Sequence, residues 1–141
     1  MCMDELMQLE GQIQMLGLPK EQEEVLMVQA ADLVRFKECF AGELQFIDPF
    51  SYKVSIVASE TNRAGICFLA QENTKSLQQV LYETNRFKRL KRVQQIWFVF
   101  VAGPGEACRQ NLGRLIAQHN IKQLCSKVFL LNYFDATLHI L

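Results

Sequence analysis

The segment that most constrains the fold of this chain is Gln95–Ala102, in which every residue after Gln95 is apolar. A short apolar run of this kind is typical of a buried β-strand, and it is far shorter than the roughly 20 residues of a membrane-spanning helix. A helical pattern precedes it over 75–93, and another follows it and ends near Asn120. The sequence therefore predicts an α/β fold built around this strand.

The first half of the chain contains two further helical patterns and three strand-like segments. Apolar residues recur every three or four positions over 4–16 and 19–41, which predicts two helices. The strand-like segments are 44–47, 52–58 and 65–70. We expect the Asp48-Pro49 pair to separate the first two of them. Another strand is expected over 127–131, and a terminal one over 137–141 is left open.

The length and apolar content of the chain favour one domain. Its 141 residues are 50% hydrophobic, which is enough for a single continuous core without metals or disulfides. We expect a single α/β domain over 19–141, with a three-layer αβββαβ core and a mixed central sheet. An amphipathic helix over 1–18 is added at its N-terminus, and a helix and strand are added at its C-terminus.

Charge is divided unevenly along the chain. Residues 1–84 hold 13 Asp and Glu against 6 Lys and Arg, whereas residues 85–141 hold 2 against 9. Five of the nine basic residues form one run: Arg86, Lys88, Arg89, Lys91 and Arg92. On a helix they would form an outward stripe while Phe87 and Leu90 turn inward. The run predicts contact with nucleic acid or with an acidic protein surface, and the sequence leaves these alternatives open.

The order of helix, three strands, helix and strand resembles the restriction-endonuclease-like, or PD-(D/E)xK, superfamily from about 19 to 121. Gln78 and Tyr82 are also spaced like a motif of its RecB-type members. Active members hold a divalent metal ion with an acidic residue on the second strand and Glu-x-Lys on the third. The corresponding segments here, around Ser55 and Ala70, lack these residues. The resemblance implies a degenerate, non-catalytic member that contributes a basic surface to a nucleic-acid-processing assembly.

A migrated metal site is the interpretation that would make the chain a nuclease. Asp48, Glu72 and Lys75 lie near the ends of the relevant strands. Such a site would use Mg²⁺ or Mn²⁺, and no cofactor or metal is expected without it. The spacing of Glu72 and Lys75 differs from that of the usual pair, so the pattern favours a protein that is not an enzyme.

The remaining interpretation is a protein–protein adaptor or a homodimer without nucleic-acid contact. Apolar residues of the N-terminal helix and the aromatic stretch 129–134 motivate it, because aromatic side chains with polar tips are common at interfaces.

The cysteines and the N-terminal residues indicate in which cellular compartment the protein is expected. Cys39, Cys67 and Cys125 lie among apolar residues without metal-ligand spacing, and acidic residues stand where a signal peptide carries basic ones. We expect a soluble protein of a reducing intracellular compartment, cytoplasmic or nuclear, with no membrane contact.

Overall fold

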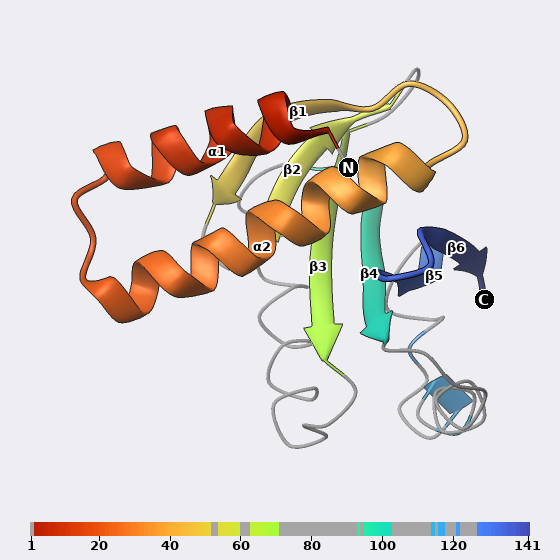
Figure 1. The fold of residues 1–141 in the computed structure, drawn as a ribbon. Coiled ribbons are helices and arrows are strands. Elements are labelled where there is room, and N and C mark those ends of the chain that lie inside the picture. The colour runs from red at the N-terminus through yellow and green to blue at the C-terminus, as the bar shows by residue number, and fades with distance from the viewer. Residues whose placement is uncertain are drawn as a thin grey trace.

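The structure is a computed structural model that describes residues 2–51, 54–59, 63–70, 93, 95–102, 114, 116–117, 121 and 127–141. Within these residues lie two helices and six strands (Figure 1): α1 (Met3–Met15), α2 (Lys20–Cys39), β1 (Gln45–Ser51), β2 (Val54–Ala58), β3 (Arg63–Ala70), β4 (Gln95–Ala102), β5 (Lys127–Asn132) and β6 (Thr137–Ile140). Most of the helix predicted over 75–93 lies outside the described residues. None of the helices in the described ranges is long and apolar enough to cross a membrane.

The six strands form one mixed sheet in the order β1-β2-β3-β4-β5-β6. β1, β2 and β3 are successive antiparallel neighbours. β3, β4 and β5 are parallel, and β6 returns antiparallel to β5. The predicted α/β class and mixed sheet are therefore confirmed, and the terminal strand that the sequence left open is present.

α2 covers one face of the sheet with an aromatic cluster. The side chains of Phe36 and Phe40 reach Trp97 on β4 and Phe129 on β5, with ring centroids 5.2 Å apart for Phe36 and Phe129 and 5.5 Å for Phe40 and Trp97. Trp97 is 1% exposed. Aromatic packing at these distances adds to the area that each ring buries, so this cluster fixes how α2 crosses the sheet.

α1 packs on α2 and not on the centre of the sheet. Leu6, Leu9 and Ile13 are buried against Ala30 and Val34 of α2. These residues recur at helical spacing, as the sequence predicted, and they hold α1 and α2 together as a helical hairpin (Figure 1).

On the opposite face of the sheet, the structure describes three buried residues from the segments that connect the parallel strands. Val93, Ile116 and Ile121 pack there against Phe98 and Phe100 of β4. Phe98 and Phe100 alternate along the strand with Trp97 and Val99, which face α2. The centre of β4 is therefore buried on both faces.

The prediction that Asp48-Pro49 separates two strands is wrong. Both residues lie within β1, which runs on to Ser51. β1 is an edge strand, and its pairing with β2 shifts register on both sides of Asp48. Proline is tolerated at an edge or a bulge because no ladder hydrogen bond is needed from its nitrogen.

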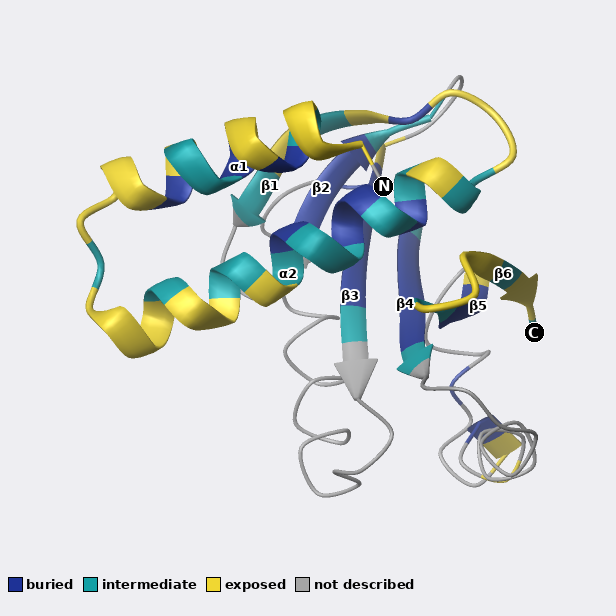
Figure 2. Cartoon of the chain, viewed as in Figure 1, coloured by how far each residue is buried: buried dark blue, intermediate teal, exposed yellow. Residues whose placement is uncertain are grey.

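The start of α2 also differs from its sequence pattern. Val25 and Val28 fit the apolar periodicity, but they are 65% and 63% exposed. Figure 2 shows that this end of α2 extends past the sheet, where only α1 lies beside it. Leu16, at the other side of the hairpin turn, is exposed for the same reason.

Candidate functional site

The structure describes only one of the three residues of the predicted metal site. Asp48 is exposed on β1, and Glu72 and Lys75 lie outside the described residues. Within the described ranges, no group of three or more His, Cys, Asp or Glu side chains could hold a metal ion. The migrated site therefore stays a prediction.

The predicted nucleic-acid-binding run, Arg86, Lys88, Arg89, Lys91 and Arg92, also lies outside the described residues, as do Gln78 and Tyr82. The run is followed closely by Val93, which is buried among the residues that cover the sheet face opposite α2.

On β2, where an active nuclease of the resembled superfamily carries an acidic residue, a closed hydrogen-bond network surrounds Ser55. The Ser55 side chain is fully buried, and its hydroxyl donates to the carbonyl oxygen of Pro49 at 2.7 Å. The Gln29 amide of α2 donates to that carbonyl at 3.0 Å and to the Ser55 hydroxyl at 2.9 Å. The network joins α2, β1 and β2, and it satisfies the buried hydroxyl without a charge.

Among the described carboxylates, Asp32 has the pKa that differs most from its ordinary value. Burial raises its pKa from the ordinary 3.8 to about 6. Arg35, three residues further along α2, already contacts Glu38 and Tyr133. Sequence reasoning missed Asp32, because helical periodicity does not indicate how deeply a polar residue beside the apolar stripe is buried.

Arg35 joins three segments that are far apart in the sequence. Its Nε donates to the Tyr133 carbonyl oxygen at 2.8 Å, and its guanidinium lies 5.4 Å from the centre of the Tyr133 ring. Its Nη1 pairs with Glu38 at 3.2 Å, and Glu38 in turn accepts a hydrogen bond from the backbone nitrogen of Cys2. Arg35 thereby connects α2 to the β5–β6 turn and to the start of α1.

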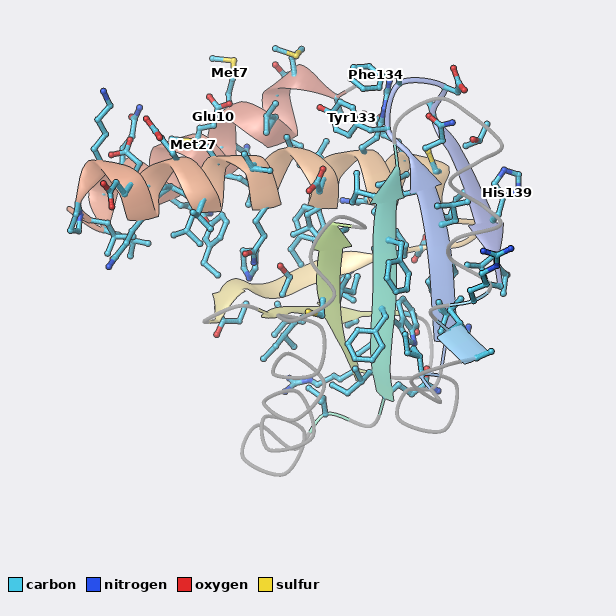
Figure 3. The ribbon with its side chains drawn as sticks, turned by 90° about the horizontal axis from the view of Figure 1, so that it is seen from below. Met7, Glu10, Met27, Tyr133, Phe134 and His139 are labelled. Atoms are coloured by element: carbon cyan, nitrogen blue, oxygen red, sulfur yellow. The ribbon has the colours of Figure 1, made fainter. Side chains whose placement is uncertain are left out.

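These contacts place apolar side chains of the helical hairpin and of the β5–β6 turn on one side of the molecule. We call this set the methionine–aromatic surface: Met3, Met7, Met27, Tyr133 and Phe134. Met3, Met7 and Phe134 are 58%, 62% and 73% exposed. Figure 3 shows Met7 and Met27 on the side of the hairpin away from the sheet, and Tyr133 and Phe134 at the same side of the view. Met3 is one helical turn before Met7 and shares its face.

A separate hollow of about 450 Å³ lies between α1 and β1. Its lining comprises Glu5, Gln8, Leu9, Gln12, Lys37, Gln45, Phe46, Ile47 and Pro49. Lys37 forms an ion pair with Glu5 and lies 4.9 Å from the centre of the Phe46 ring. Because the two charges of the lining neutralise each other, the hollow presents mainly amide groups and apolar walls.

No known protein family matches the sequence, and no curated protein or solved structure is significantly similar to the chain. The resemblance to the PD-(D/E)xK superfamily therefore rests on the order of the elements and on the Gln78 and Tyr82 spacing. It stays a prediction, and the function has to be argued from this chain's own residues.

Proposed function

We propose that this chain is a non-catalytic module of nuclease-like architecture that contributes a binding surface to a nucleic-acid-processing assembly. The observation that carries the proposal is the Ser55 network. A metal-dependent nuclease needs clustered carboxylate oxygens on its sheet, whereas β2 here presents a buried hydroxyl with its partners in place. β3 likewise contains no carboxylate, and its one charged residue is Arg63.

In this proposal, nucleic acid binds the basic run 86–92. Each phosphate that a Lys or Arg neutralises releases counterions, which makes duplex binding fall with salt by a slope of about 0.9 per contact. We expect an electrophoretic mobility shift at low salt with the parent protein. Reversing Arg86, Lys88, Arg89 and Arg92 to Glu is expected to abolish the shift.

The matched control reverses four exposed basic residues elsewhere: Lys20, Arg63, Arg114 and Lys127. It changes the net charge by the same amount, so it separates contact at the run from general repulsion. We expect the control to retain most of the binding. Equal loss in both variants would contradict binding through the run, and no shift with the parent protein would refute nucleic-acid contact altogether.

The non-catalytic part of the proposal has its own test. Single- and double-stranded DNA and RNA are incubated with Mg²⁺ or Mn²⁺, using the parent protein and Glu72→Gln. We expect no cleavage by either protein. Cleavage by the parent that disappears in Glu72→Gln would instead assign a nuclease with the migrated site Asp48, Glu72 and Lys75.

A second candidate function is protein–protein contact, including homodimer formation, through the helical hairpin. The methionine–aromatic surface favours it, because Met3, Met7 and Phe134 stay more than half exposed. Light scattering across a concentration series tests self-association, and Met7→Gln with Phe134→Gln should weaken it. A reducing intracellular location, cytoplasmic or nuclear, is part of both candidates, and the burial of the Cys67 side chain in the apolar core is compatible with it.

A further inference from the structure

The chemistry of the methionine–aromatic surface restricts what can cover it. Methionine side chains are flexible and polarisable, so the exposed Met3 and Met7 can adapt to apolar side chains of different shapes, while Met27 is half-buried against the core between α1 and α2. Tyr133 and Phe134 add two rings whose centroids are 5.7 Å apart in an edge-to-face arrangement. A surface with adaptable methionines and fixed aromatic rings suits a partner that inserts several apolar side chains at once.

The charge around this surface is strongly acidic. α1 and α2 together carry eight Asp and Glu residues against three Lys and Arg residues. Two of those three, Arg35 and Lys37, form ion pairs with Glu38 and Glu5. Figure 3 shows Glu10 on the same side of the hairpin as Met7 and Met27, and Asp135 directly follows Phe134 in the β5–β6 turn.

The sign of this charge selects among the classes of partner. Nucleic acids and anionic lipid surfaces are repelled by an acidic hairpin, as is an acidic peptide. A basic partner gains long-range attraction, and its apolar side chains gain contact with the methionines.

The surface is also held in place before any partner arrives. Arg35 fixes the β5–β6 turn to α2 through its 2.8 Å hydrogen bond to the Tyr133 carbonyl. Within the turn, the Asn132 amide donates to the Asp135 carboxylate at 3.0 Å, and the Asp135 backbone nitrogen donates to the Asn132 side chain at 3.3 Å. A preorganised site loses less conformational entropy on binding.

We propose that the methionine–aromatic surface binds a basic amphipathic helix of a partner protein. The apolar residues of that helix, spaced at i, i+3, i+4 and i+7, contact the methionines and Phe134, and its Lys or Arg residues face Asp4, Glu10 and Asp135. This inference rests on the second candidate function, protein contact through the helical hairpin, and specifies the partner's chemistry.

The test uses three fluorescently labelled synthetic peptides of about 18 residues, or five helical turns. The first places Leu at helical spacing with Lys elsewhere, the second replaces every Lys with Glu, and the third scrambles the Leu and Lys order. Fluorescence anisotropy with the full chain measures each dissociation constant. We expect the amphipathic Leu/Lys peptide to bind at least about tenfold more tightly than either of the others.

Two pairs of variants assign the binding to this surface. Met7→Gln with Phe134→Gln is expected to weaken Leu/Lys binding by about tenfold or more. Met15→Gln with Ile140→Gln, whose side chains are at least as exposed but lie outside the surface, should stay within about twofold. Asp4→Asn with Glu10→Gln is expected to weaken binding more than Glu43→Gln with Asp48→Asn. Thermal melting of all four confirms that they remain folded.

Two outcomes overturn the inference: equal binding of the three peptides, or equal effects of the surface variants and their controls. If the Leu/Lys peptide fails to bind while Met7→Gln with Phe134→Gln abolishes self-association in light scattering, the helix proposal is wrong and protein contact stands. If neither binding nor self-association depends on these residues, both are wrong.

Discussion

The buried carboxylate of Asp32 makes the stability of this protein depend on pH in a direction opposite to that of most acidic residues. Burial raises its pKa from 3.8 to about 6. The folded state therefore binds this proton more tightly than the unfolded state does. The resulting contribution to stability is complete below pH 3.8 and is lost as the pH rises through 6. At about 1.4 kcal/mol per pH unit, ionised Asp32 costs the folded state about 3 kcal/mol at neutral pH.

Replacing Asp32 with Asn removes the charge and keeps the shape of the side chain. At pH 7.5 we expect Asp32→Asn to raise the free energy of unfolding by up to about 3 kcal/mol, or roughly 10 °C in Tm for a chain of this size. At pH 4 the variant and the parent should be nearly equal, because Asp32 is then largely protonated in the folded parent. Urea unfolding followed by the fluorescence of Trp97, the single tryptophan, measures both values.

The difference between parent and variant isolates Asp32 from other groups that titrate in the same range. Asp48→Asn, at an exposed position on β1, is the matched control and should stay within about 0.5 kcal/mol of the parent at both pH values. The reasoning is refuted if Asp32→Asn and the parent show the same pH dependence between pH 4 and pH 7.5. A variant less stable than the parent at pH 7.5 would show that the ionised carboxylate has a favourable partner.

Five further substitutions, one of them a control, test the packing and the polar contacts. Ile13→Ala, fully buried between α1 and α2, should destabilise the fold by about 3 kcal/mol, whereas Met15→Ala, 89% exposed, should change it by less than about 0.5 kcal/mol in the same urea assay. Ser55→Ala should lower the free energy of unfolding by about 1 kcal/mol, because Gln29 still donates a hydrogen bond to the Pro49 carbonyl. Ser55→Asp should lower it several times more, because it buries a charge. Arg35→Lys keeps the charge but loses the Nε contact, so we expect a loss of about 1 kcal/mol and faster amide hydrogen exchange in the β5–β6 turn; unchanged exchange would contradict the role of Arg35.

The sequence predicted the elements with strong local patterns. The apolar run of β4 and the helical spacing of Leu6, Leu9 and Ile13 each depend on neighbouring residues alone, and the structure has them where they were expected. The end of β1 was predicted wrongly because proline was taken as a break. An edge strand that shifts register can contain proline, and whether a strand lies at an edge depends on the whole sheet.

The residues that define the methionine–aromatic surface were predicted only in part. The N-terminal helix and the stretch 129–134 were each recognised as apolar, but no local pattern places them on one side of the molecule. That placement depends on Arg35 and Tyr133, which are 98 positions apart in the sequence. Val25 and Val28 illustrate the same limit, because periodicity indicates the face of a helix but not how far the sheet extends beneath it.

The uneven distribution of charge along the chain can be compared with the two faces of the sheet. The acidic helical hairpin covers one face of the sheet, and Val93, just after the basic run, is buried on the other face. A basic partner that binds the hairpin as proposed meets the acidic residues of α1 and α2, whereas the basic run 86–92 lies outside the described residues. If the run binds nucleic acid as proposed, the opposite charges of the two partners favour binding of each to the segment of opposite sign. Under both proposals, a chain with no net charge binds a basic protein through its acidic half and an acidic polymer through its basic half.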